Sequence, residues 1–187
     1  TQDPTYLKHL FDSAEGLNRV LIGIETGHEA TSYFLGKNES FAEKEKALRT
    51  LYQAGFKLKI IVQIGMVGQA YWNQDQGRYI SSKETLDETG RLIGNISRGV
   101  TPRRPIQVLF SQYISIPGTK LAKMHQDLYP IIPYSGDESA EDDADYLEGI
   151  LQGHSRLGNI IVERKYERAL EGRRIDLEDQ RFDIAVK

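Results

Sequence analysis

Three stretches of the chain end an apolar run with residues of the kind that bind small molecules. In the first, Glu25 and Thr26 directly follow the apolar run 20–24. A carboxylate in that position is costly unless it has a partner or faces a cleft. It could accept hydrogen bonds from an ammonium group or a ribose. A carboxylate that caps the next helix or pairs with a nearby lysine explains the position equally well.

The second stretch runs from Gly65 to Gln69 and follows an apolar run that ends in Ile64. Glycines at such a position let the backbone approach a flat or anionic ligand closely. The stretch is not a phosphate loop, because the lysine and the serine or threonine of that motif are missing. A plain tight turn accounts for the glycines nearly as well.

The third stretch is Pro117, Gly118 and Thr119, which closes the apolar run 106–114. A rigid residue followed by a permissive one can hold an aromatic base against the backbone, although such pairs also make ordinary turns. The carboxyl ends of parallel strands meet at one edge of a sheet, and that edge is where α/β folds bind ligands. We therefore expect the three stretches to share one small-molecule site.

The elements that must position these residues follow from the hydrophobic pattern. The lengths between the three apolar runs suit right-handed helical crossovers, which predicts an α/β fold with about three parallel βα units. The uninterrupted apolar residues 60–62 favour a strand covered on both faces. We predict strands at 19–25, 57–64 and 106–114, and helices from Asp3, over 28–36, from Ser40 to Gly55, from Ser82 to 96 and over 120–126. Ser40 with Glu43 matches the spacing of a capping box, and Tyr33 and Ala47 are among the side chains expected to pack inward.

The remaining segments show weaker periodicity. Residues 65–82, which include Trp72, read as a long loop or lid. The acidic run 137–145 is read as the solvated first turn of a helix. Residues 160–170 read as an amphipathic helix, and 173–187 as an edge strand or ordered tail. We expect two domains, a partial barrel over 1–127 and a mainly helical extension over 128–187.

Composition excludes several classes of function. The chain has 187 residues, and its 27 acidic and 24 basic side chains give a net charge of −3, so nothing favours nucleic acid. It contains no cysteine, which excludes disulfides and thiolate-held metal within it. The four histidines lack metal spacing. The threonine start, with no signal-like or membrane-spanning run, predicts a soluble cytoplasmic chain cut from something longer.

Taken in order, the motifs resemble a known family. Over residues 20–124 the chain is similar to the C-terminal half of the radical S-adenosylmethionine (SAM) enzymes, in the branch of methylthiotransferases, cobalamin-binding radical enzymes and coproporphyrinogen-type oxidases. The matching motifs are Ile22-Gly-Ile-Glu-Thr-Gly27, Leu35-Gly-Lys37, Ala54-Gly55-Phe56, Ile64-Gly65 and Ile116-Pro-Gly-Thr-Lys-Leu121.

The resemblance implies a fold and a set of cofactor contacts. Members of this family build a partial barrel of six βα units and hold a 4Fe-4S cluster through a CxxxCxxC loop after the first strand. The cluster cleaves SAM to a 5′-deoxyadenosyl radical. This chain would supply strands four to six. By position, Glu25 and Thr26 would face the methionine or ribose, Ile64 and Gly65 the adenine, and Pro117, Gly118 and Thr119 the far side of the cofactor.

The chain also departs from the family. It lacks the cysteine loop, so the cluster would belong to a parent oxidoreductase or transferase, and this piece alone is expected to be inactive. Relatives often have proline, glycine and glutamate where this chain has residues 67–69, and an insertion follows through Ile80. The alternatives are a degenerate relative, an unrelated (β/α)-barrel fragment of the aldolase or phosphate-binding type, and a non-catalytic module that binds protein through its Trp72 loop and acidic segment.

The expected half barrel has a further consequence. It leaves at least one long strand edge without a neighbour, and exposed edges pair with other strands. We therefore expect self-association, with two copies completing each other's sheet, and no membrane partner.

Overall fold

The computed structural model describes residues 18–113, 118–127, 130–135, 139–155 and 158–165, together with residues 5, 8, 9 and 12. Within this part of the chain, four strands form a main sheet whose neighbours all run parallel, in the order β1-β2-β5-β7. A second, antiparallel sheet has the order β4-β3-β6. The strands are β1 (Arg19–Glu25), β2 (Lys57–Ile64), β3 (Ala70–Asn73), β4 (Arg78–Ser81), β5 (Ile106–Gln112), β6 (Ile131–Ile132) and β7 (Ile160–Lys165).

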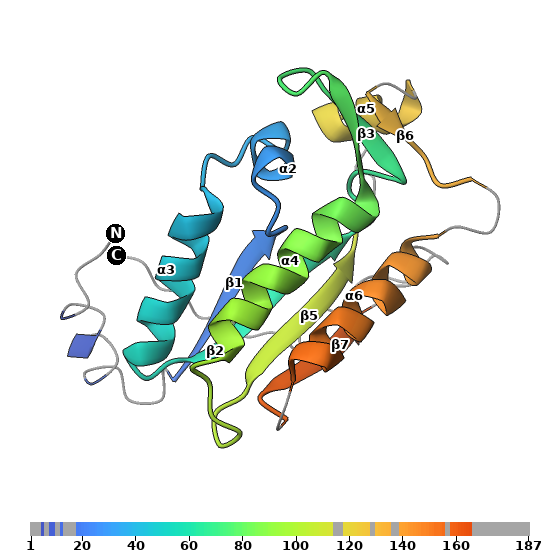
Figure 1. Ribbon diagram of the computed structural model, residues 1–187. Helices are drawn as coiled ribbons and strands as arrows, with labels where there is room; N and C mark the ends of the chain where they lie inside the picture. The colour runs from blue at the N-terminus through green and yellow to red at the C-terminus, as the bar shows by residue number, and fades with distance from the viewer. Residues whose placement is uncertain are drawn as a thin grey trace.

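The three long helices lie side by side on one face of the main sheet, as Figure 1 shows for α3, α4 and α6. The strands are ordered in space as they are in the chain, so right-handed crossovers carry every helix to the same side. The protein is thus a mixed α/β structure built on a parallel sheet. Its described helices are α2 (Glu29–Phe34), α3 (Phe41–Gln53), α4 (Ser82–Ser97), α5 (Lys120–Gln126) and α6 (Ala140–His154).

The core lies between this helix layer and the sheet. Along β2, Leu58, Ile60, Val62 and Ile64 are each at most 1% exposed. The residues between them are only half-buried, because they point to the opposite face. Among the described residues, helices therefore cover only one of the two faces of β2, whereas both were predicted to be covered.

We call this second side of the main sheet the open face, since none of the described helices lies on it (Figure 1). Leu21 at one edge and Ile161 at the other are 41% and 42% exposed. An apolar surface of this kind normally meets another layer of protein. The residues that the strand alternation places on it are Leu21, Gly23, Lys59, Ile61, Gln63, Gln107, Leu109, Ser111, Ile161 and Glu163.

Most predicted boundaries are confirmed. The strands 19–25 and 57–64 have the expected ends, and Ser40 with Glu43 forms the predicted capping box of α3. Gly55 ends that helix with a φ of +111°. Small corrections apply elsewhere: Ser81 rather than Ser82 caps α4, and two side chains expected to pack inward, Tyr33 and Ala47, are exposed.

The segment expected to be a long loop is a β-hairpin. Strands β3 and β4 pair in antiparallel register, with Trp72 opposite Tyr79, and β6 adds a third strand. Tyr71 and Ile80 point to the other face and are both 0% exposed. They form a second apolar cluster with Met66, Val67 and Ile131, against which α2 and α5 pack. The hairpin therefore has its own small core.

The expected helix over 160–170 is also corrected. Residues 160–165 form β7, a fourth strand of the main sheet, paired with β5 from Ile106↔Ile160 to Ser111↔Lys165. The main sheet therefore has four parallel strands rather than three, and the segment expected to be a helical extension contributes β7 to this sheet as well as the helix α6. The acidic run does open a helix, α6, whose first turn holds Glu141, Asp142 and Asp143.

Some predictions lie outside the described residues. They are the helix that begins at Asp3, most of whose residues are not described, residue 114 at the expected end of the third strand, Pro117, and the tail over 173–187. The described part of that strand, β5, ends at Gln112.

Candidate functional site

Glu25 ends β1 in an unusual turn. Its φ is +58°, and it is the one non-glycine residue with a positive φ in the described part of the chain. The Thr26 amide donates to the Ile24 carbonyl at 2.6 Å, so Glu25 is the middle residue of a γ-turn. Such a backbone costs about 1–3 kcal/mol and persists only where the surroundings hold it.

The turn places the Glu25 carboxylate on the open face. A Cβ at Gly23, which lies on that face, would come within 2.9 Å of Glu25 Oε1. Oε1 accepts from the Lys37 ammonium at 2.8 Å. Oε2 is buried and has no hydrogen-bond partner among the described residues. An unsatisfied buried polar atom costs about 1–3 kcal/mol, so this oxygen is placed to receive a donor from outside the described chain.

Two further polar side chains continue the line from Glu25 across the sheet. Gln63 on β2 and Ser111 on β5 are register partners, and both lie on the open face near the carboxyl ends of their strands. Neither side chain makes a hydrogen bond within the described residues. The sequence reasoning missed both, although the alternation of β2 and β5 could have placed them beside Glu25. We call Glu25, Gln63 and Ser111 the polar row.

Thr26 and Gly27 do not belong to this row. Thr26 is 2% exposed, and its hydroxyl lies 3.3 Å from that of Thr89 on α4. The Gly27 amide donates to the same Thr89 hydroxyl at 2.7 Å. A Cβ at Gly27 would lie 2.6 Å from the Thr89 Cα, so glycine is needed for β1 to approach α4. These two residues hold the turn rather than face a ligand.

The stretch after β2 is occupied by protein. Ile64 is a core residue, 1% exposed. Gly65 has a φ of +83°, and a Cβ there would meet Ala140 at 3.2 Å. Gly68 has a φ of +58°, and a Cβ there would collide with the Ile132 carbonyl oxygen. The close backbone approach that these glycines permit is therefore made to β6 and the start of α6.

The third stretch forms a helix cap. Thr119 Oγ1 accepts from the Ala122 amide at 3.2 Å and starts α5, as predicted. Gly118 precedes it with a φ of +86° and open space around its Cα. In α5, His125 Nε2 donates to the Met66 carbonyl at 2.7 Å. The helix thus packs on the loop after β2, and the structure brings Glu25, Gly65 and this helix to the carboxyl-end edge of the sheet.

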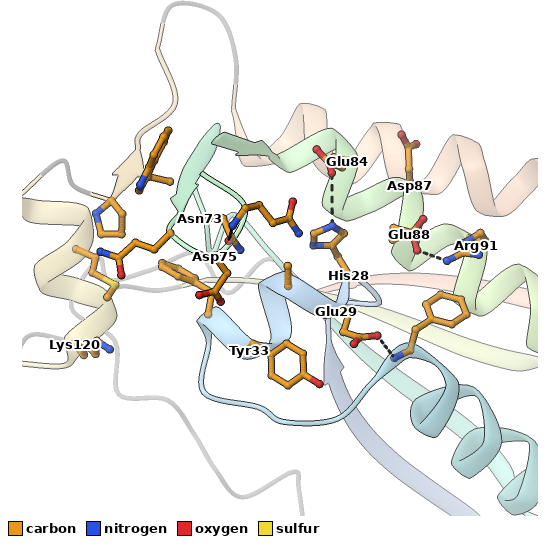
Figure 2. Close-up of a pocket in the computed structure, with 18 residues that line it drawn as sticks. His28, Glu29, Tyr33, Asn73, Asp75, Glu84, Asp87, Glu88, Arg91 and Lys120 are labelled. Carbon is orange, nitrogen blue, oxygen red and sulfur yellow. Dashed lines mark hydrogen bonds and ion pairs between the residues drawn. The ribbon is translucent and has the colours of Figure 1, made fainter. Parts of the chain in front are cut away.

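A separate pocket of about 1010 Å³ lies between α2, the hairpin, α4 and α5, and Figure 2 shows its lining. None of the residues predicted to bind the cofactor lines it. Most of its acidic side chains are already engaged: Glu84 with Arg78, Glu88 with Arg91, Asp87 with the Tyr146 hydroxyl, and Glu29 with the Phe41 amide.

His28 forms the floor of this pocket (Figure 2). The Thr31 amide donates to its Nδ1 at 3.2 Å, so the neutral ring carries its proton on Nε2, which lies 3.7 Å from Glu84 Oε1. Burial lowers the pKa of His28, against the opposing effect of Glu84. The ring is therefore neutral at pH 7. Thr31 continues the contact inward to the Tyr71 and Thr85 hydroxyls, 3.2 Å from each.

The described residues contain neither a candidate metal site nor a helix that could span a membrane. These residues contain no group of three or more histidine, aspartate or glutamate side chains able to hold a metal ion. The same residues include no helix with the length and apolar character needed to cross a membrane.

Comparison of the sequence with protein-family models and with curated proteins found no match.

Proposed function

We propose that this chain is one section of a (β/α) barrel and that its open face forms part of the wall of a SAM site in a radical SAM enzyme. The strand order, which follows the chain, and the single helix layer support the barrel section, since the bare face of such a sheet corresponds to a barrel interior. The motifs around residues 22–27 support the family. The four strands make the section longer than the three units that the family pattern implies.

The observation that carries the proposal is the Glu25 carboxylate. It is held in a strained turn at the carboxyl end of β1, and its buried Oε2 lacks a donor within the described chain. The ammonium of the methionine part of SAM and the ribose hydroxyls are both donors of the required kind. Gln63 and Ser111 extend the same polar row toward the substrate side.

The other predicted contacts add less support. Ala140 and the Tyr134 ring lie against Gly65, at 3.2 and 3.9 Å from the position of a Cβ, so its backbone is already covered on that side. The chain has no cysteine, so its residues would recognise and orient the cofactor while the cluster is held elsewhere in the parent enzyme. The bound cofactor would supply the radical chemistry.

The test is binding of SAM and of 5′-methylthioadenosine, which lacks the amino-acid part. We expect an NMR titration to show both ligands binding to the wild-type chain. Glu25→Gln keeps the size of the side chain and removes its charge. Loss of a charge-assisted hydrogen bond, about 1.5–3 kcal/mol, should weaken SAM about tenfold to a hundredfold.

Comparing SAM with 5′-methylthioadenosine shows which part of SAM contacts Glu25. If Glu25 binds the ammonium, 5′-methylthioadenosine is unaffected by Glu25→Gln, whereas a ribose contact weakens both ligands alike. Glu39→Gln, an exposed carboxylate between α2 and α3, is the matched control and should change neither. Equal SAM affinity in wild type and Glu25→Gln would contradict the proposal, as would no SAM binding at all.

The open face also predicts that the isolated chain associates with itself. Its exposed apolar residues, Leu21 and Ile161, require a cover, which the proposal assigns to the rest of the barrel or to a second copy of the chain. Sedimentation of the isolated chain should show concentration-dependent dimers that Leu21→Lys weakens. A monomer at every concentration would argue against self-association.

A further inference from the structure

Lys44 is a buried lysine on α3 whose charge has no carboxylate partner. It is 7% exposed. Its ammonium donates to the Thr26 carbonyl at 2.8 Å and to the Ser32 hydroxyl. Within the described residues it forms no ion pair. Burial lowers its pKa, while Glu39, Glu25 and Glu29 act in the opposite direction without touching it.

Core packing alone does not account for a lysine here. A buried cation without an ionic partner is expensive, and an apolar side chain of similar length would fill the same space at lower cost. The neighbouring positions on the same helix face, Leu48 and Tyr52, are occupied by such side chains. The contacts of the ammonium therefore provide the reason for the residue.

Those contacts converge on the turn at Glu25. The Thr26 carbonyl belongs to the Thr26–Gly27 peptide, one residue beyond Glu25, and the amide of the same peptide, at Gly27, donates to Thr89. Ser32 ties the same ammonium to α2. Lys44 and Thr89 thus fix both polar groups of the peptide that directly follows the strained turn. A positive φ at a non-glycine residue needs restraint of this kind.

We propose that Lys44 is the positioning residue of the Glu25 site: its buried ammonium holds the Thr26–Gly27 peptide, which follows the turn, and so keeps the carboxylate on the open face. This inference rests on the proposed role of Glu25 in ligand binding. The lysine does not reach the open face itself, and it acts through the backbone of residue 26.

The first measurement does not depend on any ligand. Amide hydrogen exchange at Thr26 and Gly27 reports opening of the turn, and exchange at Ile60 and Val62 in the central strand β2 reports opening of the whole sheet. In Lys44→Met we expect Thr26 and Gly27 to exchange about tenfold faster or more, with little change in β2. Lys46→Met, an exposed lysine on the same helix, is the matched control and should leave all four amides unchanged.

The outcomes separate a local role from a general one. Unchanged exchange at Thr26 would overturn the inference. So would an equal rise at Thr26 and throughout β2, because that pattern shows a lysine that only stabilises the fold. If Lys44→Met does not fold, Lys44→Gln, which is shorter and neutral but remains polar, takes its place with the same expectation.

The second measurement links the lysine to the ligand. SAM affinity should fall in Lys44→Met by about the same factor as in Glu25→Gln, and the double variant should lose little more, since both changes act on one contact. Additive losses would overturn the link. If the wild-type chain binds no SAM, the proposed function fails while the exchange experiment still decides whether Lys44 holds the turn.

Discussion

The turn after β1 and the loop after β2 look alike in sequence and differ in the structure. Both follow an apolar strand and both contain backbone with positive φ. In the loop over 65–69, protein atoms from β6 and α6 occupy the space beside the glycines. In the turn at Glu25, a side chain that disfavours the conformation is held in it, and one of its oxygens is left without a partner among the described residues.

The difference separates strand ends that serve packing from strand ends that could bind a ligand. A glycine whose conformation is explained by a neighbouring backbone serves packing. A strained non-glycine residue whose carboxylate keeps one buried oxygen without a donor has no such explanation within the described chain. The following predictions test this distinction, from the largest expected effect to the smallest.

Gly68→Ala should strongly destabilise the fold. The new Cβ would collide with the Ile132 carbonyl, and the backbone would remain in the left-handed region. Strain and collision together should lower the free energy of unfolding, measured in urea, by about 2–5 kcal/mol.

Gly77→Ala is the matched control, because Gly77 has a φ of +60° but a Cβ there would meet no atom within 4 Å. This change should lower the free energy of unfolding only by the cost of placing alanine at a positive φ, about 1 kcal/mol. Equal losses at Gly68 and Gly77 would show that β6 does not explain the loop.

Glu25→Gly should make the protein more stable and a poorer binder. Glycine adopts the turn without strain and removes the unpaired oxygen, which outweighs the loss of the part-buried pair with Lys37. We expect a gain of about 1 kcal/mol in urea unfolding, together with the weakened SAM binding expected for Glu25→Gln. Glu39→Gly, an exposed residue of ordinary φ, should instead be neutral or destabilising. A loss of stability in Glu25→Gly would mean that the turn is not strained.

Lowering the pH should weaken the region around the Glu25 turn and not the loop over 65–69. His28 lies in the hydrogen-bond network behind the turn, whereas residues 65–69 contain no titratable side chain. Burial lowers the folded-state pKa of His28 below its ordinary 6.5. The unfolded chain therefore binds the proton first, and the stability present above pH 6.5 is lost as the pH falls through the folded-state pKa.

His28→Asn keeps a good helix N-cap and removes the titrating ring. Its urea-unfolding free energy, compared with that of the wild type between pH 8 and about pH 5, should fall less steeply with acid. Parallel curves for the two proteins would contradict a role for His28 in this dependence.

The sequence predicted much of the sheet because local signals agreed there. An apolar run followed by glycine marked β2 correctly, and the spacing of Ser40 and Glu43 marked the start of α3. The strand β7 was mistaken for a helix, since its apolar residues at 160–162 followed by charged ones also fit an amphipathic helix. Pairing with β5, a contact distant in sequence, decides between the two.

The site was predicted less completely than the fold. Glu25 was found from its position after a strand, but its γ-turn has no sequence signature, since Glu rarely adopts that conformation. Thr26 was read as a ligand contact although it is buried against Thr89. The hairpin did carry a readable signal: the pair Tyr71-Trp72 and the pair Tyr79-Ile80 lie on either side of a polar segment that ends in Gly77, which suits a turn between two strands.

All four strands of the main sheet run in the same direction, and this restricts how two copies of the chain could join. If like edges met across a twofold axis, with β1 beside β1, the new pair would run antiparallel. If β7 of each copy met β1 of the other, around an axis along the strands, every pair would stay parallel and the ring would close. Four strands from each copy then give 2 × 4 = 8, the number found in a complete (β/α)₈ barrel, with both polar rows at the same mouth.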